Sequence, residues 1–179
     1  MRILVGGVGN IFLGDDAFGS EVARRLLNRE LPRQVRVIDF GIRGFDLAFA
    51  LMDGYDATIL IDAAPRGGRP GTLYTIEPDL SELDGLNGQE VRVDTHGMNP
   101  VKVLAMARSM GVEFRRILVV GCEPETLGPE GEGQLGMSAT VARSVDEAVS
   151  LVEALVSDLI SSDDECRTLQ YSEDGEQKL

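Results

Sequence analysis

The sequence predicts an α/β fold, specifically a three-layer α/β/α sandwich with a mainly parallel central sheet. Short apolar runs alternate along the chain with longer segments in which apolar residues recur at helical spacing, the order typical of such folds. The apolar runs at residues 57–62 and 117–121 are nearly continuous, as expected of strands covered by helices on both faces. A length of 179 residues with 43% hydrophobic content suits one domain with a full hydrophobic core.

The first half of the chain supplies two strand–helix units and a third strand. The first strand is expected to break at Gly6 and Gly7. The helix that follows carries Phe18, Val22 and Leu26 at four-residue spacing. The elements expected in this half are strands at residues 3–5, 35–39 and 57–62, and helices at residues 17–30 and 45–52.

The second half adds an edge strand, a further buried strand and two helices. Asn99 is a good N-cap, Pro100 suits the first helical position, and Gly111 ends that helix. The last helix begins at Ser138 and carries one apolar stripe, formed by Val141, Val145, Ala148, Val152, Leu155 and Leu159. The other elements expected in this half are strands at residues 72–76 and 117–121, a helix at residues 100–110, and loops at residues 78–90 and 123–136.

The predicted domain covers residues 1–161, and residues 162–179 are expected to form a disordered acidic tail. The tail has too little apolar surface to offset the entropy cost of ordering it. The chain has no apolar run of the ~20 residues that a transmembrane helix needs, and its N-terminus lacks the layout of a signal peptide. We therefore expect a cytoplasmic protein that does not contact a membrane.

The charge and cysteine content exclude two further classes. A formal net charge of -13 disfavours nucleic acid as a partner, because phosphate binding needs clustered Lys and Arg. Cys122 and Cys166 are too few and too far apart to indicate a disulfide framework. We expect Cys122 to be a small core residue and Cys166 to be a free thiol.

Three polar residues are expected to meet at the carboxyl edge of the sheet, where α/β folds bind ligands. Asp16 follows the first strand, Asp62 ends the third, and His96, the only histidine, precedes the helix at residues 100–110. Two carboxylates and an imidazole can bind a divalent transition metal, or can perform acid–base chemistry without one. Structural roles are also open: Asp15 and Asp16 could cap the following helix, Asp62 could form a strand-end turn, and His96 could be an ordinary loop residue.

A dinucleotide site is the competing interpretation of the first turn. Gly7-Val-Gly9 follows a strand as in a dinucleotide-binding fingerprint, and Asp39 ends the second strand where a ribose-binding acid would stand. The third fingerprint position, however, is Phe12 instead of Gly or Ala. An acidic helix start would also repel a pyrophosphate. The chain contains neither a Walker-type phosphate loop nor a Gly-x-Ser-x-Gly nucleophile motif.

A long motif and five shorter segments carry a family resemblance. The long motif, at residues 3–19, is Ile-Leu-Val-Gly-Gly-Val-Gly-Asn-Ile-Phe-Leu-Gly-Asp-Asp-Ala-Phe-Gly. The shorter segments follow in order: Asp39-Phe-Gly-Ile-Arg-Gly, Leu60-Ile-Asp-Ala-Ala, the His96 segment, Val120-Gly-Cys-Glu-Pro-Glu and Leu135-Gly-Met-Ser. Over residues 1 to about 155 the chain resembles the hydrogenase maturation endopeptidases. That family removes a short C-terminal extension from the large subunit of nickel–iron hydrogenases.

The resemblance implies a peptidase in which Asp16, Asp62 and His96 are both the nickel-recognition ligands and the catalytic residues. Nickel would arrive bound to the precursor, and a water near it would hydrolyse the peptide bond; other divalent metals could also occupy the site. The implied partner is the immature large subunit of a nickel–iron hydrogenase, and the enzyme is expected to be a monomer. Asp39 would lie at the same edge, either supporting the site or turning the chain. The alternative is a chaperone that checks the precursor for nickel without cutting it.

Overall fold

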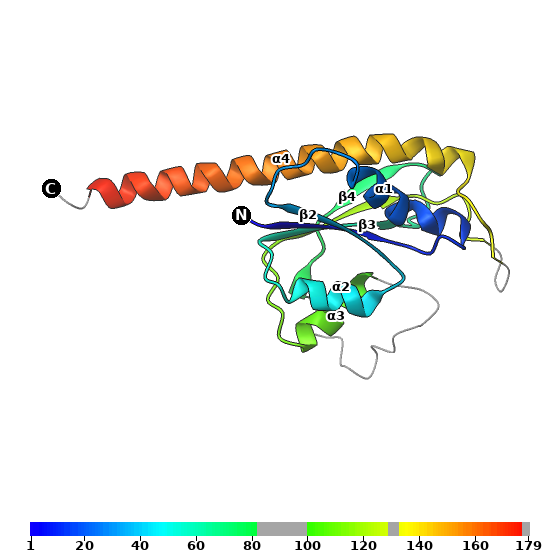
Figure 1. The fold of residues 1–179 in the computed structure, drawn as a ribbon, viewed down its shortest axis with the longest axis horizontal. Helices are drawn as coiled ribbons and strands as arrows, with labels where there is room; N and C mark the ends of the chain where they lie inside the picture. Colours follow the sequence, from blue (N-terminus) through cyan, green and yellow to red (C-terminus); the bar gives the residue numbers. More distant parts are fainter. Residues whose placement is uncertain (82–99, 129–132, 177–179) are drawn as a thin grey trace.

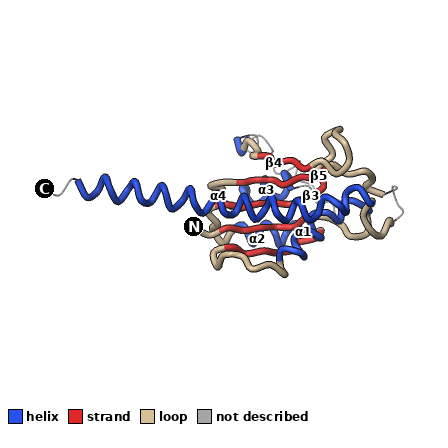
Figure 2. Tube along the Cα trace, turned by 90° about the horizontal axis from the view of Figure 1, so that it is seen from above, coloured by secondary structure: helices blue, strands red, loops and turns tan. Residues whose placement is uncertain are grey.

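The computed structural model describes residues 1–81, 100–128 and 133–176, with side chains up to Glu165. It confirms the predicted architecture, because a five-stranded, mainly parallel sheet lies between two layers of helices (Figure 1, Figure 2). The strands are β1 (Ile3–Val8), β2 (Val35–Gly41), β3 (Ala57–Ala63), β4 (Leu73–Ile76) and β5 (Ile117–Cys122). Their order is β2-β1-β3-β5-β4, and only β4 is antiparallel to its neighbour.

Helices cover both faces of this sheet (Figure 1). One face is covered by α1 (Phe18–Leu26) and α4 (Ala139–Glu176), and the other by α2 (Gly44–Leu51) and α3 (Pro100–Ser109). Successive side chains of β1 point to opposite faces. Ile3 and Val5 therefore join the core with α1 and α4, whereas Leu4 and Val8 join the core with α2 and α3. This double burial explains why the central strands are apolar without alternation.

Two glycines allow α1 to lie directly against the sheet. An added Cβ at Gly19 would lie 2.0 Å from the carbonyl oxygen of Ile61, and one at Gly7 would lie 2.3 Å from the carbonyl oxygen of Gly19. Only glycine permits such a close approach of backbone to backbone. The predicted strand break at Gly6 and Gly7 is therefore wrong: β1 continues through both glycines to Val8, because the missing side chains admit the helix.

The segment after β1 is more divided than the sequence predicts. A short 3-10 helix, η1 (Gly14–Ala17), precedes α1, and α1 ends at Leu26 instead of residue 30. The intervening turn and η1 place residues 9–17 beyond the carboxyl end of β1. The polar residues of that segment therefore reach the edge at which β1, β2, β3 and β5 all end.

The last helix also differs from the prediction. α4 is continuous from Ala139 to Glu176, and its red end projects past the sheet in Figure 1. Among the described side chains, the buried residues of α4 end with Val156 and Leu159, and the helix then continues to Glu176, where a disordered tail was expected. A helix can extend in this way because its backbone hydrogen bonds are internal. The domain boundary at residue 161 stays a prediction. No helix in the described ranges is both long and apolar enough to cross a bilayer.

Candidate active site

Two carboxylates meet at the carboxyl edge of the sheet. Asp62 is the penultimate residue of β3 and pairs in register with Gly121 of β5. Asp16 lies in η1, just beyond the end of the neighbouring strand β1. The two side chains are close enough that the charge of Asp16 helps to raise the pKa of Asp62, after the larger effect of burial. The fold thus brings together two of the three predicted site residues.

The turn that precedes Asp16 holds its side chain. The Oδ2 of Asp16 accepts a hydrogen bond from the backbone N–H of Asn10 at 2.7 Å. The Oδ1 of Asn10 in turn accepts one from the backbone N–H of Phe12 at 3.0 Å. Gly9 has a φ of 143°, and an added Cβ there would lie 1.8 Å from the carbonyl oxygen of Asp16. Only glycine fits this position. Partial burial raises the pKa of Asp16 more than the Asn10 hydrogen bond lowers it.

Asp62 is the more deeply buried member of the pair, with 9% of its surface exposed. Burial raises its pKa well above the usual range, the charge of Asp16 adds to this, and a hydrogen bond from the Ala63 backbone offsets part of it. The pair therefore retains a proton at a pH where an isolated aspartate would lose it. Such a pair can donate or accept protons during hydrolysis, and a bound cation would favour its fully ionised form.

Asp15 has a structural role different from the helix cap considered above. It is completely buried, and neither η1 nor α1 has a side-chain hydrogen bond at its N-cap. Its Oδ2 accepts the backbone N–H groups of Glu125 at 2.8 Å and Thr126 at 2.9 Å. Its Oδ1 accepts the N–H of Ser138 at 2.6 Å. Asp15 therefore joins η1, and with it Asp16, to the loop after β5 and to the start of α4.

A cavity of about 300 Å³ lies beyond the ends of β1 and β2. The N–H that Asp16 binds belongs to Asn10, which is part of the cavity wall. Asp39 also lines the cavity, and its Oδ1 accepts a hydrogen bond from the Gly41 N–H at 3.1 Å, so it turns the chain at this edge as well. Exposed apolar side chains at the cavity are Ile11, Phe12 and Ile42. An apolar surface therefore lies next to the turn that holds Asp16, although neither Asp16 nor Asp62 lines the cavity itself.

The turn after β1 does not suit a pyrophosphate. The N–H of Asn10 donates to the Asp16 carboxylate, and the N–H of Gly9 donates to the carbonyl oxygen of Gly41 at 3.0 Å. Phosphate binding at a helix start depends on such N–H groups being available, and here a carboxylate already occupies one of them. These contacts disfavour the dinucleotide interpretation.

The third predicted site residue, His96, lies outside the described residues, in the segment 82–99. The helix α3 begins at Pro100, directly after that segment. Within the described ranges, no three Cys, His, Asp or Glu side chains form a group that could hold a metal ion. Asp16 and Asp62 could supply two oxygen ligands, and the role of His96 as a third ligand stays a prediction.

Sequence reasoning misses another buried acid at this edge, Glu123, which directly follows β5. Its carboxylate accepts the backbone N–H groups of Arg66 at 2.9 Å and Gly67 at 3.0 Å, and the hydroxyl of Tyr74 at 2.8 Å. Burial acts to raise the pKa of Glu123, but these hydrogen bonds lower it overall. The hydrogen bond between Tyr74 and Glu123 also raises the pKa of Tyr74. The signal that could have found it is a carboxylate directly after a buried strand, as for Asp62.

Comparison with known families and curated proteins gives a consistent result. Residues 20–155 match the family model described as hydrogenase maturation protease, HycI. The hydrogenase 2 maturation protease of Escherichia coli is 32% identical over 156 residues, covering 86% of this chain and 90% of that protein.

Solved structures agree with the sequence comparisons. The hydrogenase maturating endopeptidase HybD from E. coli has a TM-score of 0.66 at 30% identity, covering 88% of this chain and 93% of that chain. The hydrogenase 2 maturation peptidase from a Thaumarchaeota archaeon has a TM-score of 0.64 at 35% identity, covering 87% of this chain and 98% of that chain.

Proposed function

Since this chain belongs to the hydrogenase maturation protease family and is a peptidase, we propose that it processes the large-subunit precursor of a nickel–iron hydrogenase. It removes a C-terminal extension from that precursor once nickel has been inserted. The observation that carries this proposal is the pair Asp16 and Asp62, placed at the open edge of the sheet beside a cavity of about 300 Å³. The reaction takes place in the cytoplasm, and the enzyme acts as a monomer.

In this proposal nickel is part of the substrate and not a resident cofactor. Carboxylate oxygens from Asp16 and Asp62, with the imidazole of His96, complete the coordination of a nickel ion that the precursor already holds. Ligating carboxylates must be ionised, so capture of the ion displaces the proton that the buried pair retains. A precursor without nickel supplies no cation to displace this proton, so the pair stays partly protonated, and this difference makes docking depend on nickel.

The proposed chemistry is hydrolysis by a water held near the acid pair. The water oxygen attacks the carbonyl carbon of the scissile peptide bond, and one of its protons passes to a carboxylate acting as general base. The C–N bond then breaks, and the leaving amine takes up the proton. Asp16 is assigned as the base because it is the less buried of the two carboxylates. The apolar side chains at the cavity hold the extension peptide next to the pair.

The decisive experiment is incubation with the nickel-loaded precursor, followed by mass spectrometry of its C-terminus. We expect a defined loss of mass with the nickel-loaded precursor and none with the nickel-free precursor. Asp16→Asn and Asp62→Asn should remove cleavage. Asp158→Asn is the matched control, because Asp158 is an exposed residue of α4, on the face of the sheet opposite to α2, and lies outside the site. Capture of an intact precursor without any cleavage would favour the nickel-checking chaperone and contradict the proposal.

A further inference from the structure

One side of α2 presents apolar side chains to solvent. Phe45, Phe49 and Met52 follow at intervals of four and three residues, which places them on one face of the helix, and Ile42 lies just before it. All four are more than half exposed, and we call them the α2 stripe. The opposite face of α2 carries Leu47, Ala48 and Leu51, which are buried in the core beneath it. Packing among the described residues therefore accounts for only one of the two apolar faces.

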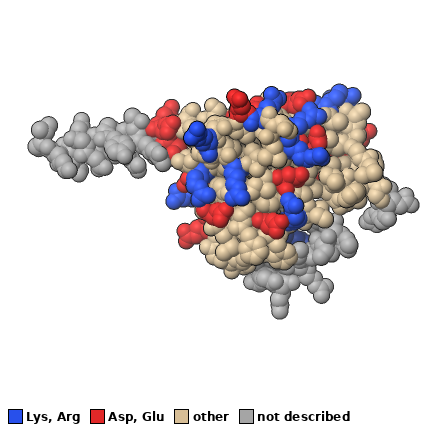
Figure 3. Space-filling view, viewed as in Figure 1, with Lys and Arg blue, Asp and Glu red and all other residues tan. Residues whose placement is uncertain are grey.

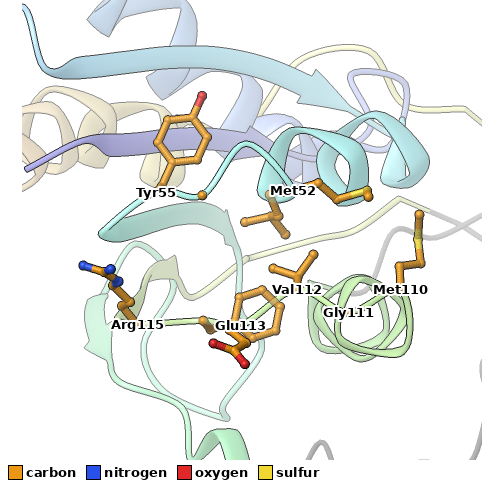
Figure 4. Close-up of a pocket in the computed structure, with 10 residues that line it drawn as sticks. Met52, Tyr55, Met110, Gly111, Val112, Glu113 and Arg115 are labelled. Carbon is orange, nitrogen blue, oxygen red and sulfur yellow. The ribbon is translucent and has the colours of Figure 1, made fainter.

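The α2 stripe connects two hollows of the surface. At its start, Ile42 lines the cavity beside the acid pair. At its other end, Met52 lines a second cavity of about 460 Å³ at the amino edge of the sheet. Figure 4 shows Met52 across this second cavity from Met110 and Val112, which follow α3. A partner that lies along α2 would thus reach from the second cavity to the proposed active site.

The charges beside the α2 stripe are paired with each other. Arg43 forms an ion pair with Asp46 at 3.1 Å, and Arg36 forms one with Asp53 at 3.2 Å. In Figure 3 the lowest described part of the visible face, around α2 and α3, is largely free of charged side chains. A complementary surface would therefore be apolar, and its binding should depend little on salt.

The size of the α2 stripe distinguishes a transient partner from a permanent dimer. Four side chains that are each about half exposed present on the order of 400 Å² of apolar surface. A stable dimer interface buries about 800 Å² on each partner. A second copy on α2 would also cover Ile42 and Arg43, which line the cavity that the extension must enter. A substrate that leaves after cleavage fits both the small area of the α2 stripe and its position beside this cavity.

Because the α2 stripe is continuous with the cavity at Ile42, we propose that it docks an apolar surface on the folded body of the hydrogenase large-subunit precursor. The inference rests on the proposed function, and it adds a second contact, remote from the nickel and from the cleaved bond. The α2 stripe anchors the body of the precursor while its C-terminal extension lies in the cavity beside Asp16 and Asp62. Met52 and Met110 then contact the precursor at the edge of the second cavity, since methionine adapts to irregular partners.

The test compares the double variant Phe45→Gln and Phe49→Gln with the matched control Leu27→Gln. Leu27 and Phe49 are equally exposed, at 57%, and Leu27 lies at the end of α1 on the other face of the sheet. We expect the double variant to raise KM for the nickel-loaded precursor by about tenfold or more, with kcat nearly unchanged. Binding of precursor immobilised on a sensor should weaken by a similar factor, and Leu27→Gln should change neither value.

Other outcomes would overturn the inference. An unchanged KM would show that the precursor does not contact α2. A large fall in the melting temperature of the double variant would show that the chain covers the α2 stripe itself. A wild-type dimer that the double variant converts to monomer, measured by sedimentation, would assign the α2 stripe to self-association. Wild type that binds the precursor without cleaving it would contradict the proposed function alone, and wild type that neither binds nor cleaves it would overturn both.

Discussion

Asp15 and Asp16 are neighbours in the chain, and replacing each by asparagine should affect stability in different ways. In Asp15→Asn, the amide oxygen can still accept the N–H groups of Glu125 and Thr126, but the amide NH2 then faces the N–H of Ser138. Losing the charge weakens two hydrogen bonds by about 1 kcal/mol each, and an unsatisfied buried N–H costs about 1–3 kcal/mol. Together these losses should reduce the free energy of unfolding by about 3–5 kcal/mol.

Asp16→Asn should leave the stability unchanged or increase it slightly. The raised pKa of Asp16 shows that its ionised form is disfavoured by burial, and a neutral amide removes this penalty. The amide oxygen can still accept the N–H of Asn10. The same change also removes the repulsion between Asp16 and Asp62. Cleavage of the precursor should nevertheless be lost, because the acid pair is incomplete.

Urea unfolding followed by circular dichroism measures both effects. The midpoint should fall for Asp15→Asn with an unchanged m-value, and its melting temperature should fall by on the order of 10 °C. The midpoint for Asp16→Asn should equal or exceed that of wild type. Equal losses in the two variants, or a loss below about 1 kcal/mol in Asp15→Asn, would refute the assignment of Asp15 as a structural anchor and Asp16 as a site residue.

Three further predictions concern an acid, an imidazole and a helix end. The pKa of Glu123 is lowered in the fold, so its stabilising effect is present above the pKa of the unfolded carboxyl and is lost as pH falls through the lower folded value. Glu123→Gln should therefore have a lower melting temperature than wild type at pH 7, and this difference should shrink as the pH falls below the ordinary glutamate pKa of about 4.3; a difference that is constant with pH would contradict this. His96→Ala and His96→Gln should both be folded by circular dichroism and inactive on the nickel-loaded precursor, whereas normal turnover by His96→Gln would exclude a ligand role. Deleting residues 163–179 should change the melting temperature by less than about 2 °C and leave cleavage intact, because the buried residues of α4 end at Leu159 among the described side chains, which reach Glu165, and the surface ion pair between the Met1 amino group and Asp163 contributes little. A larger fall would show that the tail stabilises the domain.

The layered architecture and the positions of Asp16 and Asp62 at one edge of the sheet could be predicted from the sequence because both depend on local patterns. The apolar run that ends at Asp62 marks a strand buried on both faces with a carboxylate at its carboxyl end. The glycine turn followed by Asp16 marks a second polar residue at the same edge. Parallel topology then brings the two ends together, whatever the details of packing.

Contacts between distant residues needed the tertiary structure. Glu125, Thr126 and Ser138 stand more than 100 residues from Asp15, so no local pattern could show that this acid anchors their N–H groups. The helix-cap interpretation assumed that a carboxylate binds the nearest free N–H groups, but a buried carboxylate binds whichever donors the fold presents to it. Gly7 likewise resembles a strand break until α1 is seen packed against it. Side-chain periodicity reports only which face of an element is buried, whereas hydrogen-bond partners and close approaches depend on the elements that pack there.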